Sequence, residues 1–166
     1  ITNFDFYDLT AIVKKKWIVD FCKLLIKNNL NVIWQLPSGT RSEAIDGEVA
    51  FLLKKAGCRN LSYAPESGSP EVLELIKKKM SIKKMLDSMK SCVSEGLSVK
   101  VNIICGFPKE TRKHLVETIG FIIQTAWVGC RDMSINQFSP YPGSELFDDL
   151  LKANKVKLDE NYFRGL

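Results

Sequence analysis

The sequence predicts an α/β fold built on parallel strands. Short apolar segments begin near Ile1, Asn31, Asn60, Val99 and Asp132, and a longer segment with helical spacing of apolar residues follows each one. Each interval has room for a crossover helix, so neighbouring strands should run parallel with right-handed crossovers. Five such units fit either a doubly wound sheet or part of a (β/α) barrel. In both folds the functional loops lie at the carboxyl ends of the strands.

The expected elements follow from this spacing and from the residues that end each segment. Strands are expected at residues 1–7, 31–36, 60–64, 99–104 and 132–138. Helices are expected at residues 12–27, 48–56, 70–79, 82–95, 112–127 and 145–152. Pro65 should stop the third strand, and Asp46, Ser69 and Ser81 should N-cap the helices that follow them. Thr111 should start the helix at residues 112–127, and Gly129 should end it. The lysines at 77–79 would then lie in the last turn of a helix, which suits its dipole.

The bulk composition is that of one soluble globular domain or of a part of one. The chain has 166 residues, of which 45% are hydrophobic and 26% charged. It contains no apolar run as long as a membrane span and no visible signal peptide. It begins at Ile1, inside an apolar run and without a methionine, which suggests a fragment of a longer chain.

The cysteines and the charge favour a cytoplasmic protein without a metal site of its own. The five cysteines are widely spaced and form no CxxC or CxxxCxxC pattern, so no metal or cluster site is predicted from them. Cys22 and Cys92 fall in helical patterns and should be core thiols, as in a reducing compartment. The net charge of +5 comes from lysine clusters that suit a solvated face. The sequence has no basic patch interleaved with aromatic residues. A nucleic-acid surface is therefore less favoured than a solvated face, although it stays an open alternative.

The stretch at residues 60–69 is the most informative part of the chain. A strand leads into Glu66, Ser67, Gly68 and Ser69, and Pro70 then opens a helix. Parallel α/β proteins bind ligands at such strand ends, and a glycine there can take a positive φ or let a ligand approach the backbone. The same residues are also suited to capping the helix. The stretch by itself leaves both interpretations open.

The other predicted strand ends also carry polar residues. These are Asp5, Asp8 and Thr10 after the first strand, Ser38 and Arg41 after the second, Asn102, Gly106, Glu110 and Thr111 at the fourth, and Gln137, Ser139, Tyr141 and Ser144 at the fifth. The single histidine, His114, lies in the first turn of a helix, where capping or exposure is favoured over catalysis. No Walker loop and no GxGxxG is present. These residues suit a polar small molecule with hydroxyls and an amine, but they identify no reaction and no catalytic residue.

Four pieces of the sequence together resemble the radical SAM superfamily, in particular its branch with a cobalamin-binding domain. Residues 64–69 (A-P-E-S-G-S) resemble G-x-E-S-G-S after the fourth barrel strand, and residues 104–111 (I-C-G-F-P-K-E-T) resemble I-x-G-x-P-x-E-T after the fifth. Residues 139–146 (S-P-Y-P-G-S-E-L) resemble P-Y-P-G-T-E-L after the sixth. Residues 5–10 (D-F-Y-D-L-T) resemble the Asp-rich end of the second strand, and Arg41 resembles the arginine of the third.

The resemblance implies a partial (β/α) barrel. Residues 1–152 would hold parallel strands two to six of six with the helices outside, and residues 153–166 would begin a C-terminal extension. The first strand and the CxxxCxxC loop that binds the 4Fe-4S cluster would lie upstream of Ile1. This segment alone would then be unable to cleave S-adenosylmethionine (SAM).

The resemblance also implies cofactor-binding roles for residues in the first three strand-end loops. Glu66 and Ser67 would contact the ribose or the amino-acid part of SAM. Asp5 or Asp8 would contact the methionine amine. Arg41 would pair with the SAM carboxylate, for which a fork-shaped donor is suited.

The remaining implied contacts surround the adenine. Gly106 would let the backbone approach the adenine, and Ser139 and Tyr141 would line the far side of its pocket. The family often has glycine at the position of Asn102, so the sequence departs from the family pattern at this expected adenine contact.

The implied chemistry belongs to the cofactors. The cluster would give one electron to SAM and release a 5′-deoxyadenosyl radical that abstracts hydrogen from a small-molecule substrate, and with cobalamin a methyl transfer could follow. An electron donor such as flavodoxin or ferredoxin would be a partner. A relative acting on RNA is a variant that would bind RNA in a salt-dependent way. The alternatives are a barrel lyase or aldolase, for which Lys100 inside a strand is a poor candidate, and a non-catalytic binding module.

Overall fold

Five parallel strands form one sheet in the order of the sequence. The computed structural model describes residues 2–7, 12, 14–38, 40 and 44–164. The strands are β1 (Asn3–Asp5), β2 (Ile33–Leu36), β3 (Cys58–Glu66), β4 (Ser98–Cys105) and β5 (Asp132–Gln137). Their order in the sheet is β1-β2-β3-β4-β5, and every neighbouring pair is parallel. A doubly wound sheet reverses its strand order at a switch point, whereas a barrel does not, so the structure confirms the partial barrel.

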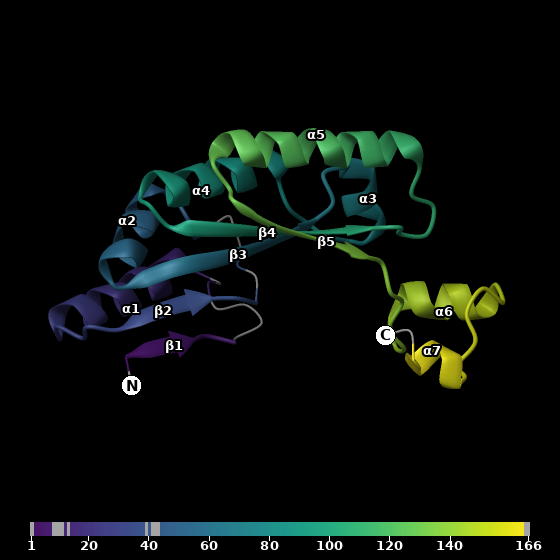
Figure 1. The fold of residues 1–166 in the computed structure, drawn as a ribbon, viewed down its shortest axis with the longest axis horizontal. Coiled ribbons are helices and arrows are strands. Elements are labelled where there is room, and N and C mark those ends of the chain that lie inside the picture. The colour runs from purple at the N-terminus through teal and green to yellow at the C-terminus, as the bar shows by residue number, and fades with distance from the viewer. Residues whose placement is uncertain (1, 8–11, 13, 39, 41–43, 165–166) are drawn as a thin grey trace.

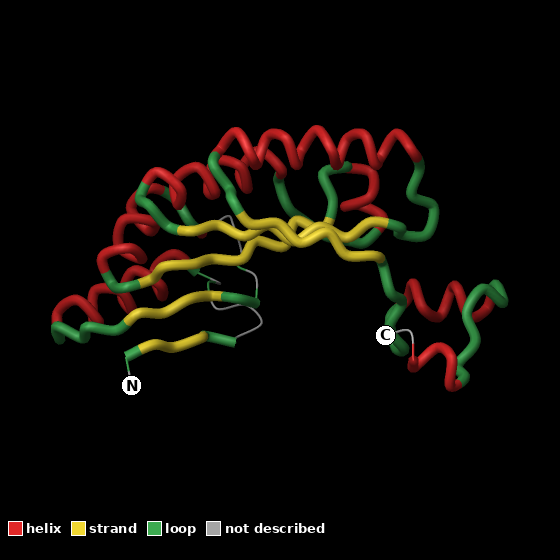
Figure 2. Tube along the Cα trace, viewed as in Figure 1, coloured by secondary structure: helices red, strands yellow, loops and turns green. Residues whose placement is uncertain are grey.

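The helices between the strands cover one face of the sheet, as Figure 1 shows. They are α1 (Lys15–Lys27), α2 (Gly47–Lys55), α4 (Ile82–Ser94) and α5 (Arg112–Val128). The short helix α3 (Pro70–Leu75) lies under α5, near the carboxyl ends of β3 and β4. Helices α6 (Glu145–Lys152) and α7 (Glu160–Arg164) lie beyond the carboxyl end of β5, away from the helical layer (Figure 2).

The core lies between the sheet and these helices. Alternate strand residues, among them Trp34, Leu61, Tyr63 and Val101, are buried against the helices. The indole N–H of Trp34 donates to the carbonyl of Ala56 at 2.9 Å, and its ring meets Phe6 and Phe21 edge to face. The hydroxyl of Tyr63 lies 2.8 Å from Ser88 Oγ of α4. The buried polar groups of Trp34 and Tyr63 therefore each have a hydrogen-bond partner within the core.

The predicted caps and thiols are largely confirmed. Asp46 accepts a hydrogen bond from the Val49 amide at 3.1 Å, and Ser81 Oγ accepts from the Lys84 amide at 3.4 Å. Gly129 ends α5 in the left-handed conformation with φ of 102°. Cys22 and Cys92 are buried in the core, as predicted.

Three expectations about element boundaries were wrong. Strand β3 runs through Pro65 to Glu66, because the pairing with β4 is irregular between Tyr63 and Glu66 and the missing proline N–H costs no ladder bond there. Helix α3 ends at Leu75, so the lysines at 77–79 follow the helix instead of occupying its last turn. Strand β1 is only three residues long, and the tail contains α7, for which the sequence predicted nothing.

We predict that replacing Trp34 by alanine lowers the free energy of unfolding by about 3–5 kcal/mol, because it leaves a cavity and an unpaired Ala56 carbonyl. Urea denaturation followed by circular dichroism measures the change. Trp127→Ala is the control, since that side chain is 85% exposed, and it should shift stability by no more than about 0.5 kcal/mol. Equal losses in the two variants would contradict the packing described for Trp34.

Candidate functional site

Three of the polar loops come together at one edge of the sheet. They follow β3, β4 and β5, which are neighbours in the sheet. Glu66 at the end of β3 pairs with Ile103, and Gly106 comes directly after the end of β4. The amide of Phe138 donates to the Cys105 carbonyl at 2.7 Å, which continues the β4–β5 pairing into the third loop. The loops containing Glu66, Gly106 and Ser139 are therefore held side by side.

Glu66 has an unusual backbone and a partly buried carboxylate. Its φ is +66°, in the left-handed region that non-glycine residues seldom adopt. Its side chain is 23% exposed, and Oε1 accepts a hydrogen bond from Lys78 Nζ at 2.9 Å. Backbone strain of this kind gathers at functional sites, where the surrounding structure holds it in place. Glu66 therefore stands out on conformation as well as on sequence.

Ser67 is completely buried and faces helix α5. Its Oγ lies 3.1 Å from Thr118 Oγ1 and accepts a hydrogen bond from the Ser69 amide at 3.1 Å. The amide of Gly68 donates to Thr118 Oγ1 at 3.2 Å. These bonds use the Ser67 hydroxyl to shape the loop. The structure places Thr118, which the sequence analysis missed, at the centre of this arrangement.

Gly68 is required by close packing. A Cβ atom at Gly68 would lie 2.4 Å from the Cβ of Phe121 and 2.8 Å from the Cα of Thr118, so the loop rests directly on α5. Gly68 is not among the residues with positive φ; in this loop that conformation belongs to Glu66. The structure shows neither of the two uses considered for this glycine: its φ is not positive, and the space beside it is filled by helix α5.

The prediction that Ser69 caps α3 with its side chain was wrong. Ser69 occupies the N-cap position, but its hydroxyl makes no capping bond and donates to Glu117 Oε2 of α5 at 2.5 Å. Pro70 at the first helical position removes one amide that would need a cap. The hydroxyl is therefore available to tie the loop to α5.

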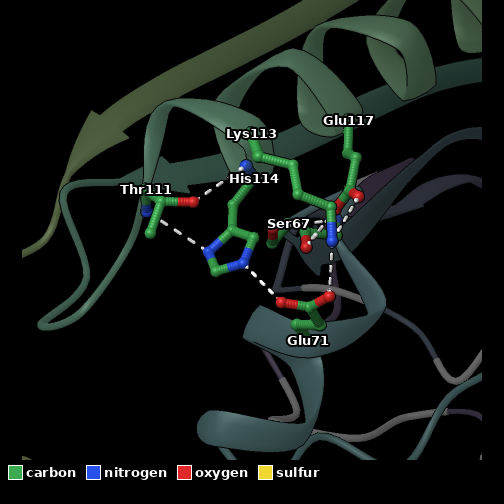
Figure 3. Close-up of polar contacts among 7 residues, drawn as sticks. Ser67, Glu71, Thr111, Lys113, His114 and Glu117 are labelled. Carbon is green, nitrogen blue, oxygen red and sulfur yellow. Dashed lines mark hydrogen bonds and ion pairs between the residues drawn. The ribbon is translucent and has the colours of Figure 1, made fainter.

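His114 links the start of α5 to α3, as Figure 3 shows. Its amide donates to Thr111 Oγ1 at 3.4 Å, and its Nδ1 accepts from the Thr111 amide at 3.2 Å, which forms a capping box. Because Nδ1 accepts, Nε2 bears the proton in the neutral ring and donates to Glu71 Oε2 at 2.7 Å. The predicted capping role of His114 is confirmed.

Glu71 completes the connection between α3 and α5. Its Oε1 pairs with Lys113 Nζ at 2.6 Å, while Oε2 meets His114. The Lys113 ammonium, followed by the bond to His114, holds the pKa of the Glu71 carboxyl below its usual range. This exposed network joins α3 to α5 (Figure 3), and the buried contact between Ser67 and Thr118 joins the preceding loop to the same helix.

Gly106 opens toward a cavity. Its φ is +89°, and a Cβ added there would find only Gln137 Cγ, at 4.0 Å, so the backbone is approachable. A cavity of about 740 Å³ lies between Gly106, Phe138, the end of α3 and Leu146 of α6. The amide of Gly106 donates to Glu110 Oε2 at 2.5 Å, while Glu110 Oε1 is buried with no hydrogen-bond partner among the described residues. A ligand-sized space with polar atoms at its edge therefore adjoins this loop.

The structure does not gather all the predicted site residues around this cavity. Asn102 is half-buried in β4 in register with Ser134, on the face opposite the helices. Ser139 is half-buried and Tyr141 is 62% exposed, and neither lines the cavity at Gly106. Asn102 lies within β4, before the strand ends, whereas Ser139 and Tyr141 lie in the loop that follows β5.

Asp5 lies away from Glu66. It is in register with Gln35, whose Nε2 donates to Asp5 Oδ1 at 2.8 Å, and Gln35 is in register with Asn60. Asn60 precedes Glu66 by six residues on β3, a rise of roughly 20 Å. The sheet therefore separates the two carboxylates along the strand direction. The candidate residues Asp8 and Arg41 lie outside the described residues.

Other chemistries find little support in the described part of the chain. Lys100, considered for a lyase, lies within β4 and faces Asp132 at 3.7 Å instead of ending a strand. No group of three or more metal-binding side chains occurs among the described residues. Burial raises the pKa of the Cys58 thiol to about 12, which keeps it protonated. None of the described helices combines the length and apolar character needed to cross a membrane.

We predict that Gly68→Ala lowers the free energy of unfolding by about 1–3 kcal/mol, because the added methyl must push the loop away from α5. Gly120→Ala is a matched control on α5 itself. A Cβ there meets nothing within 4 Å, so this variant should be neutral or gain up to about 1 kcal/mol. Chemical denaturation of both variants measures the difference, and a Gly68 variant as stable as the wild type would contradict the close approach.

We also predict that the stabilisation from Glu71 depends on pH. Its folded-state pKa is lowered, so its contribution is present above the ordinary carboxyl range and is lost as the pH falls through the folded-state value. The melting temperature of Glu71→Gln should therefore lie below that of the wild type near neutral pH and approach it at about pH 3. Glu74→Gln, an exposed change on the same helix, is the control and should show no such convergence.

Comparison with known proteins places this arrangement in a family. The Radical SAM superfamily matches residues 2–122. An uncharacterized methyltransferase from Pyrococcus horikoshii is 30% identical over 165 residues, which are 98% of this chain and 34% of that protein. The anaerobic magnesium-protoporphyrin IX monomethyl ester cyclase of Rubrivivax gelatinosus is 26% identical over 147 residues, 88% of this chain and 25% of the cyclase. The chain thus spans a third or less of the length of these relatives.

Solved structures agree on the fold. The radical SAM methyltransferase TsrM of Kitasatospora setae, with cobalamin and a [4Fe-4S] cluster bound, superposes with a TM-score of 0.74 at 13% identity, covering 92% of this chain and 31% of TsrM. Coproporphyrinogen III oxidase of Escherichia coli, a radical SAM enzyme, gives a TM-score of 0.61 at 20% identity, covering 88% and 32% of the two chains. With the family match, the motif order and the parallel sheet in agreement, this chain belongs to the radical SAM superfamily.

Proposed function

We propose that this chain is the SAM-binding part of a radical SAM enzyme of the cobalamin-dependent methyltransferase type. The observation that carries the proposal is the juxtaposition of the Glu66 and Gly106 loops at the ends of adjacent strands, where the Gly106 loop lines a cavity of about 740 Å³. Methyltransferases and methylthiotransferases among the relatives support the reaction class. Because the chain spans only about a third of its relatives, the activity of the whole protein is an inference from the family.

The residues of this edge suit the polar parts of SAM. One oxygen of Glu66 is engaged by Lys78, and the other is left to accept hydrogen bonds from ribose hydroxyls or from the amine. The approachable backbone at Gly106 suits a flat adenine ring. Ser67 contributes by fixing the loop, since its own hydroxyl is buried against Thr118.

The other candidate residues complete the proposed site. Ser139 and Tyr141 would border the adenine from the loop after β5, and Asn102 would approach it from β4. Asp5 or Asp8 and Arg41 would serve the amino-acid part of SAM from the loops after β1 and β2. Of Asp5, Asp8 and Arg41, the structure describes only Asp5, which lies away from Glu66 along the sheet.

The described residues do not fit the iron–sulfur cluster, because they contain no cluster of metal ligands. In the family that cluster supplies the electron that cleaves SAM. The ligands for the cluster and the binding domain for cobalamin would come from other parts of the protein. This chain contributes the binding, orientation and shielding of SAM.

We infer a cytoplasmic enzyme that acts on a small-molecule substrate and receives its electron from a donor such as flavodoxin or ferredoxin. The free thiols of the five cysteines support a reducing compartment. An RNA substrate is the less favoured alternative, supported by the net charge of +5 and by the likeness to a tRNA methylthiotransferase of Drosophila melanogaster. RNA binding that is absent or independent of salt would count against it.

We predict that Glu66→Gln in the full-length protein weakens the binding of SAM by about tenfold to a hundredfold, as expected for the loss of hydrogen bonds to a charged acceptor. Isothermal titration calorimetry without reductant measures the affinity. Glu74→Gln, an exposed change on α3, is the control and should bind SAM as the wild type does. Unchanged affinity in a folded Glu66→Gln protein would remove Glu66 from the site.

A further inference from the structure

We propose that Lys78 is a positioning residue that holds the Glu66 carboxylate in the orientation needed to bind SAM. Lys78 Nζ donates to Glu66 Oε1 at 2.9 Å and also to the carbonyl of Ala64. One ammonium group thus bridges the Ala64 backbone near the end of β3 and the side chain of Glu66, the last residue of that strand. This inference rests on the proposed SAM site.

The end of helix α3 places this lysine. Lys77 adopts a left-handed φ of 56°, and its amide donates to the Glu74 carbonyl at 2.9 Å. The Lys78 amide donates to the Leu73 carbonyl at 2.8 Å. These two bonds form a Schellman motif, which reverses the chain at the end of the helix. The reversal returns the Lys78 side chain to the strand end from which α3 began.

The neighbouring lysines do not share this arrangement. Lys77 pairs with Glu145 of α6, and its side chain is 71% exposed, whereas that of Lys78 is 30% exposed. Lys79 is exposed. A partly buried ion pair with a second hydrogen bond is more restrictive than a surface pair, whose members move freely in water. Only Lys78 of the three is therefore placed to orient Glu66.

The arrangement leaves Glu66 able to bind a ligand. A carboxylate accepts about four hydrogen bonds, and Lys78 occupies one position on Oε1. With Oε1 engaged and the backbone fixed in the left-handed region, Oε2 has a defined direction. A ligand that donates two hydroxyl groups would then meet an acceptor that is already ordered, so less freedom is lost on binding.

The test is a double-mutant cycle in the full-length protein, with SAM as the probe and no reductant. Lys78→Met should weaken SAM binding on the order of tenfold, and Lys78→Arg should restore part of the loss. Lys79→Met is the matched control and should bind as the wild type does. In a Glu66→Gln background, Lys78→Met should cause no further loss, because the residue acts through the carboxylate.

The outcomes separate this inference from the proposed site. If Glu66→Gln weakens SAM binding and Lys78→Met does not, the positioning role is overturned and the SAM site stands. Losses that simply multiply in the double variant would also overturn it, since they would show that Lys78 acts independently of Glu66. Unchanged binding in Glu66→Gln itself would overturn the proposed site, and the role of Lys78 with it. Should Lys78→Met fail to fold, Lys78→Gln replaces it, because this side chain retains a donor for the Ala64 carbonyl without the charge.

Discussion

The site depends on the contact between the loop after β3 and helix α5. Gly68 rests on Thr118 and Phe121 so closely that no side chain fits between them. The buried hydroxyl of Thr118 serves both Ser67 and the Gly68 amide, so the loop finds its polar partners inside the protein. Because Phe121 also belongs to the core, the loop that carries Glu66 is anchored to the same apolar layer that holds the sheet and helices together.

Helix α3 strengthens this anchor from both of its ends. Near its start, Glu71 joins Lys113 and His114 at the first turn of α5. Just past its end, Lys78 returns to Glu66 and to the strand. A helix of only six residues has little stability of its own, so these contacts hold it in place. The strained backbone of Glu66 lies just before α3, and its side chain is held by Lys78, so the surrounding structure can maintain the strain.

The agreement with the radical SAM family has two independent sources. The relatives match this chain over 88–98% of its length at 26–30% identity, and the solved structures share its fold at 13–20% identity. The fold alone would leave the reaction open, because barrels of this kind carry many chemistries. The structure adds that the Glu66 and Gly106 loops follow neighbouring strands, with a partly buried carboxylate in one loop and an approachable backbone in the next.

The sequence by itself determined the type and order of the elements, because apolar spacing reports which face of each segment is buried. It also determined the caps at Asp46, Ser81 and Thr111 and the polar residues at the strand ends, since these depend on local chemistry. The roles of Lys78 and Thr118 could not be predicted, because nothing in the local sequence distinguishes Lys78 from the two lysines beside it or Thr118 from any other threonine in a helix. The sequence interpretation assigned the Ser67 hydroxyl to the ligand and the Ser69 hydroxyl to capping, and the structure turns both toward α5. Only the tertiary structure decided which residues cross from one element to another, because such contacts depend on strand register and helix packing, which no single segment encodes.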